Sequence, residues 1–376
     1  MNDFHSVPVN PVADDVTLAP VSGPGAWRGA ELTKKPESWT YELSSEQIDE
    51  LISAVHKVEA TAKEIVEVSK ADFPLGSWEP LIDRLRQDLY DGRGFALVKG
   101  FPVEELTPLQ RTLGYFGIGA HFGIAIPQNA KGHLMGHVCD IGVDYASPTG
   151  RGYQSNARLP FHTDSADIVG LLCVNNSAEG GESSIVSSVT LYNEMLARRP
   201  DLARLLMGPI YRDRQDEIPD GQGPWYVVPV FNPYQGRVFS SYVRSTVRKA
   251  ARFTDLPPMT PALEEAMDLL DSLAEDPEFH LDMELEAGDI QLLCNHFMLH
   301  SRNAFTDPSN TSARRHLLRL HLCSPDGPPL PPVFENLRGY NADKRPQGMV
   351  KEGLCYSAPV DPIDGGPGGS AQRMRG

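Results

Sequence analysis

Long apolar segments are missing from this chain of 376 residues. No run approaches the roughly 18 apolar residues that a membrane-spanning helix requires. Residues 1–11 are polar, and they lack the basic stretch followed by an apolar stretch that marks a secretory signal. These absences predict a cytoplasmic protein that does not have a membrane as a partner.

Cysteine and positive charge are also scarce. The five cysteines have no CxxC spacing, so we expect free thiols in a reducing compartment and no zinc site built on cysteine. The 34 basic residues are outnumbered by 50 acidic ones, which leaves a formal net charge of −16. Such a charge disfavours nucleic acid or an anionic membrane as partner. It leaves the local charge of a buried site open.

The chain reads as one mainly β domain with helical decorations, flanked by two less regular ends. Residues 1–35 are expected to form a flexible or loosely docked arm, and the Gly- and Pro-rich residues 356–376 a disordered tail. Between them, residues 36–355 predict a single domain. One helix begins near Ser44, which has capping-box spacing to Gln47. Further helices are predicted at 78–90, 191–206 and 261–274, and strands at 94–98, 225–231, 237–243, 290–294 and 315–323.

Two separated segments carry most of the functional information, Leu-Pro-Phe-His-Thr-Asp at 159–164 and Asn-His-Phe-Met-Leu-His at 295–300. Together they offer His162, Asp164 and His300. Two imidazoles and one carboxylate are the ligand set of non-haem Fe(II) oxygenases, and they leave coordination positions open for chemistry.

A histidine two residues before an acid is a weak signal by itself. With 11 histidines and 50 acidic residues among 376, chance produces roughly 1.5 such strings. The chain has two. His280-Leu281-Asp282 follows an acidic turn and is expected in a solvated loop. His162 and Asp164 precede an apolar run, and on an extended backbone their side chains point to the same side.

The segment after His300 adds a second signal. In the predicted strand 315–323, Arg315, Leu317, Arg319 and His321 share one face. Two arginines on an internal face are costly unless anions meet them. A dicarboxylate is such an anion, because a planar guanidinium binds a carboxylate with two parallel hydrogen bonds. The alternative is a surface position in ion pairs with acidic neighbours.

With these motifs in place, residues 43–332 resemble the TauD/TfdA family of Fe(II)- and 2-oxoglutarate-dependent dioxygenases. The resemblance rests on four elements in the family's order: the strand at 94–98, His162-Thr163-Asp164, the Gly-Gly-Glu-Ser segment at 180–183, and His300 followed by the two arginines. It implies a double-stranded β-helix, or jelly roll, with helices packed outside.

The resemblance also implies residue roles. His162, Asp164 and His300 resemble the iron ligands. Arg315, helped by Ser183, resembles the group that binds the distal carboxylate of 2-oxoglutarate. The spacing from His300 to Arg315 is longer than in some members, so Arg314 stays a rival, and His321 stands where relatives often carry tryptophan. Arg319 resembles a substrate-binding arginine, and the other expected substrate contacts are Arg158, Asn156 and Gln128.

Other polar residues near the motifs have structural interpretations. Arg302 and Asp307 are expected to pair and to hold the loop after the third metal ligand. His296 and Asn295 are expected to form hydrogen bonds near the strand end rather than to bind metal.

The expected enzyme uses Fe(II), 2-oxoglutarate and O₂ to oxidise an unactivated C–H bond of a small carboxylate or amino-acid-like substrate, with release of succinate and CO₂. The same cofactors could instead drive desaturation or cyclisation in specialised-metabolite biosynthesis. A Zn²⁺-dependent hydrolase with the same ligands and a non-catalytic jelly-roll binding protein are alternatives of other classes. The sequence does not name the substrate, and it is compatible with a homo-oligomer.

Overall fold

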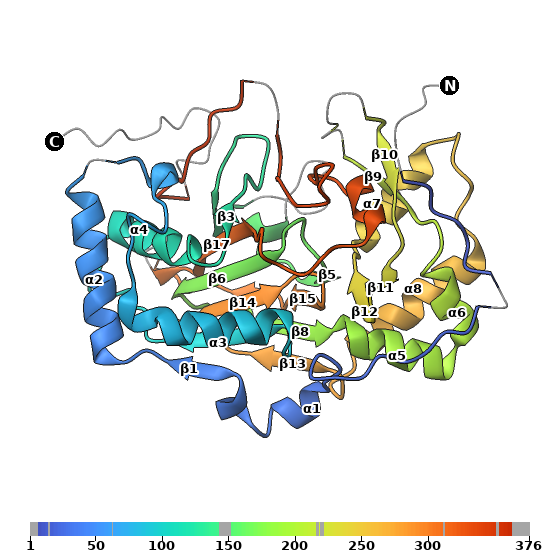
Figure 1. Ribbon diagram of the computed structural model, residues 1–376, viewed down its shortest axis with the longest axis horizontal. Coiled ribbons are helices and arrows are strands. Elements are labelled where there is room, and N and C mark those ends of the chain that lie inside the picture. The colour runs from blue at the N-terminus through green and yellow to red at the C-terminus, as the bar shows by residue number, and fades with distance from the viewer. Residues whose placement is uncertain are drawn as a thin grey trace.

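The computed structural model describes residues 7–13, 16–61, 63–142, 152–215, 218, 222–310, 313–350 and 353–362. Two antiparallel-rich sheets form its centre (Figure 1). The larger sheet has seven strands, with β1 (Thr40–Glu42), β2 (Phe95–Lys99), β14 (Ile290–Cys294), β6 (Ile168–Asn175), β17 (His316–Cys323) and β3 (Ile124–Ala125) in that spatial order and β4 (Met135–Val138) also paired to β17. The smaller sheet has four strands in the order β13 (His280–Met283), β8 (Ser183–Ser187), β15 (Met298–Arg302) and β5 (Leu159–His162).

Three two-stranded sheets make up the rest of the β structure in the described part of the chain. β9 (Tyr211–Asp213) pairs with β10 (Trp225–Val227), β11 (Phe231–Tyr234) with β12 (Arg237–Ser240), and β7 (Glu179–Gly180) with β16 (Phe305–Thr306). The predicted strand at 225–231 is therefore divided between β10 and the start of β11.

Helices cover the outside of the sheets, as the jelly-roll expectation requires. α3 (Glu79–Tyr90) packs against β2 and β14, and α4 (Pro108–Gly119) packs against β17 and against α2 (Ser45–Glu59). α2 begins with the predicted capping box of Ser44 and Gln47. At the other end of the molecule lie α5 (Ser188–Arg198), α6 (Pro200–Leu205), α7 (Arg244–Lys249) and α8 (Pro261–Ala274) (Figure 1).

Burial explains why the central strands form where they do. All five residues of β14 are buried, because it lies between β2 and β6 with α3 over one face. Such a strand reads as a continuous apolar run. One apolar cluster surrounds the larger sheet, and a second fills the space beneath α5, α6 and α8. Among the described residues, no helix is both long and apolar enough to cross a membrane.

Two further expectations about local structure need correction. The predicted helix at 191–206 is two helices, because Pro200 cannot continue a helix and Arg199 before it has an extended φ of −145°. The residues around His280 are strand β13 rather than a solvated loop, and His280 is half-buried with Nδ1 3.1 Å from the carbonyl oxygen of Ala274.

Both ends of the chain contact the domain where they are described. In the N-terminal arm, α1 (Gly29–Leu32) follows the buried Trp27, whose indole N–H donates to the carbonyl of Arg93. Near the C-terminus, Ser357 forms a bridge with His133. These parts are docked, and the remainder of the predicted tail, 363–376, lies outside the described residues.

Candidate metal centre

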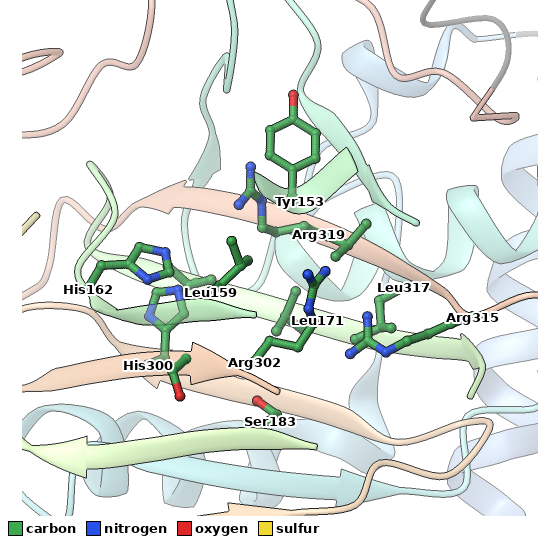
Figure 2. A pocket seen from close by; sticks show the side chains of 13 residues that line it. Tyr153, Leu159, His162, Leu171, Ser183, His300, Arg302, Arg315, Leu317 and Arg319 are labelled. Atoms are coloured by element: carbon green, nitrogen blue, oxygen red, sulfur yellow. The ribbon is translucent and has the colours of Figure 1, made fainter. Parts of the chain in front are cut away.

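The two sheets bring the three proposed metal ligands together. His162 on β5 and His300 on β15 are direct cross-strand partners, and their ring centroids are 4.3 Å apart. Asp164 follows β5, and one ligand atom from each residue lies within 4.8 Å of the other two. Figure 2 shows the two imidazoles facing one another at one end of a cavity. His280 and Asp282 lie on β13 at the opposite edge of the small sheet and take no part.

The backbone before His162 orients its ring. The register between β15 and β5 shifts here, so that Arg302 pairs with Leu159 while His300 pairs with His162. Pro160 lies within this irregular stretch, where the lack of an N–H costs no ladder bond. Its carbonyl oxygen is 2.8 Å from Nδ1 of His162. Because a carbonyl can only accept, Nδ1 carries the proton and Nε2 is left with the lone pair that a metal needs.

The protonation states also suit a metal site. Burial, followed by the neighbouring His300, lowers the pKa of His162 to about 4, so this imidazole is neutral near neutral pH. Burial opposes ionisation of Asp164, but His321 and Arg319 outweigh it and hold the pKa of Asp164 well below its ordinary value. A neutral imidazole at His162 and an ionised carboxylate at Asp164 result.

Neighbouring side chains hold Asp164 in place. Asn295 accepts the Asp164 N–H at 2.8 Å and donates to the carbonyls of Asp164 at 2.7 Å and Ala166 at 3.0 Å. His321 Nε2 donates to Oδ2 of Asp164 at 3.0 Å. The expected structural role of Asn295 agrees with these contacts. The His321 contact was not anticipated, although its position on the Arg315 face was the signal that could have shown it.

The cavity beside these ligands is lined from both sheets. Its aliphatic wall includes Val138, Leu159, Val169, Leu171 and Leu317, and its polar wall includes Ser183, Arg302, Arg315 and Arg319 (Figure 2). Arg315, Leu317 and Arg319 therefore share the inward face that alternation along the strand predicts.

Arg315 is a buried cation with donors left over. Its side chain is 3% exposed, and Nη2 donates to the carbonyl of Gly181 at 3.0 Å. Nε and Nη1 are buried and have no hydrogen-bond partner among the described residues. Burial lowers the pKa of Arg315 to about 10, which still leaves it charged at neutral pH. The arrangement fits an anionic ligand such as a carboxylate, whereas the rival Arg314 is exposed.

The Gly-Gly-Glu-Ser segment makes room for this guanidinium. Gly181 has φ +81°, and a Cβ there would lie 2.8 Å from Nε of Arg315. Ser183 lines the cavity and donates its hydroxyl hydrogen to Oε1 of Gln291 at 2.9 Å. To assist a carboxylate, as the resemblance implies, the Ser183 hydroxyl would have to rotate away from Gln291.

Arg319 contacts Tyr153, Gln128 and Asp164, whose Oδ2 lies 3.6 Å from Nη1 of the arginine. Its guanidinium lies 4.7 Å from the centre of the Tyr153 ring, and Nε donates to Oε1 of Gln128 at 2.8 Å. Both amide hydrogens of Gln128 are already used, since Nε2 donates to the carbonyls of Arg319 and Leu134. Gln128 thus contacts the arginine proposed to bind substrate and positions it.

Two expected substrate contacts lie elsewhere. Arg158 and Asn156 are exposed and do not line the cavity, and Arg158 forms an ion pair with Glu275. Both residues were expected in the site because they lie shortly before His162 in the sequence, but the loop turns their side chains outward. We do not include them in the proposed substrate site.

The residues with expected supporting roles have definite contacts. His296 is buried, and Nε2 lies 2.7 Å from Oδ1 of Asp167, in line with the structural role expected for it. Asp307 accepts the backbone N–H of Arg315 at 2.8 Å. Arg302 donates to the carbonyls of Ser155 and Ala157. The pairing expected between Arg302 and Asp307 stays a prediction.

Comparison with known proteins identifies the family of this chain. Residues 57–321 match the family model described as taurine catabolism dioxygenase TauD, TfdA family. The chain is 30% identical over 337 residues to FR-33289 synthase of Streptomyces rubellomurinus, which covers 88% of this chain and 99% of that protein. It is 29% identical over 305 residues to the taurine hydroxylase-like protein SAT17 of Stachybotrys chartarum, which covers 78% of this chain and 77% of that protein.

Solved structures show the same fold. An asparagine oxygenase determined with Fe(II), 2S,3S-3-hydroxyasparagine and succinate has a TM-score of 0.60 at 14% identity, over 76% of this chain and 93% of that one. The non-haem iron oxygenase OrfP, determined with Fe and α-ketoglutaric acid, has a TM-score of 0.57 at 14% identity, over 75% and 93%. The jelly-roll expectation is confirmed, and the chain belongs to the TauD/TfdA family of dioxygenases.

Proposed function

We propose that this dioxygenase oxidises a C–H bond of a small carboxylate or amino-acid-like substrate, with 2-oxoglutarate as cosubstrate. One observation carries the proposal: the buried guanidinium of Arg315 has two donors without a partner, in the same cavity as His162 and His300. A metal site with three ligands accounts for the two histidines but not for Arg315. The unpartnered donors of Arg315 require an anion bound in the same cavity.

His162, Asp164 and His300 would hold Fe(II), and Arg315 would hold the distal carboxylate of 2-oxoglutarate. Bound together with O₂, these groups would supply an oxidant able to remove hydrogen from a C–H bond, and 2-oxoglutarate would become succinate and CO₂. The ligand set supports iron, because it matches the two-histidine, one-carboxylate triad of non-haem Fe(II) oxygenases.

The protein's own contribution to such a reaction is placement and exclusion of water. Arg319, fixed by Gln128 and covered by Tyr153, would bind an acidic group of the substrate and so select which C–H bond faces the metal. The aliphatic wall, which includes Leu159 and Leu171, would keep water from the reacting atoms.

An amino-acid-like substrate is supported by the shared fold with an asparagine oxygenase that was determined with hydroxylated asparagine. The likeness to a protein named as the synthase of one compound favours specialised metabolism, where desaturation or cyclisation is a second outcome of the same cofactor chemistry. Product analysis by mass spectrometry separates them, because hydroxylation adds one oxygen atom and desaturation removes two hydrogens.

A Zn²⁺ hydrolase built on the same three ligands leaves the donors of Arg315 unexplained. It also predicts turnover without O₂. The free state of all five cysteines supports a reducing compartment, and we place the enzyme in the cytoplasm.

The test is anaerobic addition of Fe(II) and then 2-oxoglutarate to the intact chain, followed by visible absorption. A metal-to-ligand charge-transfer band is expected, and His162→Ala or Asp164→Ala should abolish it without unfolding the protein. His280→Ala is the matched control, because His280 belongs to the chance string on β13 and should leave the band unchanged. A well-folded protein without the band would refute the cosubstrate assignment.

A further inference from the structure

Arg302 is a cavity residue whose position follows from strand alternation. It lies two residues after His300 on β15, so both side chains point to the same face of the small sheet. Its side chain is 5% exposed. In Figure 2 its guanidinium lies in the middle of the cavity, between the two histidines and Arg315.

Arg302 donates hydrogen bonds to the loop that precedes β5. Nη2 donates to the carbonyl of Ser155 at 2.9 Å and also to the carbonyl of Ala157. The carbonyl between them, that of Asn156, accepts the N–H of Phe305 at 3.2 Å. Three consecutive carbonyls of the loop are therefore held from β15 and β16. The Phe305 ring lies 4.8 Å from the Arg302 guanidinium and completes the attachment.

This loop carries the wall that faces Arg319. It begins with the short 3₁₀ helix η4 (Gly152–Gln154), which contains Tyr153, and it ends where β5 begins at Leu159. Tyr153 covers the Arg319 guanidinium, and Leu159 lines the cavity. A displacement of the loop would therefore move both the cover of Arg319 and the strand that carries His162.

We propose that Arg302 is a positioning residue that fastens residues 152–158 to the metal-bearing strand and so shapes the substrate side of the cavity. The inference rests on the proposed function. A guanidinium suits the task because the two hydrogens of Nη2 point in fixed directions in its plane, so that this one nitrogen donates to both carbonyls, which a lysine ammonium does with less preorganisation. The competing role is direct binding of 2-oxoglutarate by Arg302.

The test uses the intact protein loaded anaerobically with Fe(II) and 2-oxoglutarate. Amide hydrogen exchange is measured across residues 152–158 in the wild type, Arg302→Gln and Arg302→Lys. Loss of charge-assisted bonds to the loop should speed exchange there by about 10-fold to 100-fold in Arg302→Gln. Arg302→Lys, which keeps the charge and can donate to one carbonyl, should recover part of the protection. Arg158→Gln is the control, because its exposed guanidinium lies in the same loop and should leave exchange unchanged.

A second readout separates positioning from cosubstrate binding and from general loss of structure. The charge-transfer band should persist in Arg302→Gln, with an affinity for 2-oxoglutarate within about threefold of the wild type. Succinate formed in air without any added substrate should increase, since a loosened wall admits water.

Unchanged exchange in Arg302→Gln would overturn the proposal. So would a loss of 2-oxoglutarate affinity as large as that caused by replacing Arg315, because Arg302 would then be a ligand of the cosubstrate. If Arg302→Gln does not fold, Arg302→Lys decides through the same two measurements. A wild-type protein that lacks the band would refute the proposed function, while the exchange comparison would still report on the loop.

Discussion

Replacing Arg315 with methionine should separate the cosubstrate site from the stability of the fold. The change removes a buried guanidinium and keeps a side chain that can fill the space. Affinity for 2-oxoglutarate should fall, because Nε and Nη1 are the donors that no described residue uses. The apo protein should be as stable as the wild type or more so, since an unmatched buried charge is replaced by an apolar group.

The magnitude follows from those two donors. A hydrogen bond to a charged group contributes about 1.5–3 kcal/mol, so two of them contribute about 3–6 kcal/mol. At about 1.4 kcal/mol for each factor of ten, the dissociation constant should rise by roughly 100-fold to 10,000-fold. The apo protein loses the bond from Nη2 to the Gly181 carbonyl, about 1.5–3 kcal/mol on the same scale, and the contact of the guanidinium with the Phe305 ring. The relief of charge burial acts against both losses.

Two measurements check this. Anaerobic titration of the Fe(II) protein with 2-oxoglutarate gives the affinity through the charge-transfer band, and urea unfolding of the apo protein gives the stability. Arg314→Met is the matched control: its side chain is exposed, and its effect on stability should stay within about 0.5 kcal/mol. Wild-type affinity in Arg315→Met would refute the reasoning. Loss of affinity in Arg314→Met alone would show that the other arginine binds the cosubstrate.

Three further predictions concern neighbouring residues. Gly181→Ala should weaken 2-oxoglutarate binding, because the added Cβ would displace Arg315. Gly236→Ala is the control: Gly236 has a similar φ of +77°, but a Cβ there would have no atom within 4 Å, so only stability should fall. Equal affinities for 2-oxoglutarate in the two variants would contradict this. Burial and a neighbouring histidine lower the pKa of His316 to about 3, so the unfolded chain takes up a proton first as pH falls below about 6.5. Its stabilising contribution is present above that pH and is lost toward pH 3; urea unfolding of His316→Gln should therefore depend less on pH than the wild type. His321→Phe removes a donor to the carboxylate ligand Asp164 and should weaken Fe(II) binding about 10-fold to 100-fold. His321→Asn can still donate and should retain part of the affinity. Anaerobic metal titration measures both variants, and wild-type affinity for Fe(II) in His321→Phe would contradict this role of His321.

Much of the site could be predicted because a strand places alternate residues on one face. That rule correctly put Arg315, Leu317 and Arg319 on the inward side of β17. The rule also put His321 on this face, although its hydrogen bond to Asp164 was not inferred from it. It extends to Arg302, two residues after His300, whose position in the cavity was not inferred. Alternation along the strands was therefore enough to predict the position of Arg302 in the cavity, but that prediction was not made.

Other features depend on tertiary structure that no local pattern contains. His280 and His162 each begin the same pattern, a histidine two residues before an aspartate. Only the strand order, which puts β13 at the far edge of the small sheet, distinguishes the two. Arg158 precedes the metal strand, yet it points outward to Glu275 because the loop is attached through its carbonyls. The break at Pro200, by contrast, was readable from the sequence, since the residue before proline avoids helical backbone.

The position of β5 at the rim of the small sheet gives the metal a mechanical role. β5 pairs with β15 alone in the order of the four strands, and the proposed ligands come from both sides of that single pairing. A bound ion would then cross-link the outermost strand to β15 and oppose its detachment, which would expose backbone groups able to pair with another chain. Any divalent ion that fills the three-ligand site should therefore protect the purified protein from self-association, even an ion that cannot support oxidation. Many divalent ions would then protect the protein from aggregation, whereas catalytic turnover would require iron in the same site.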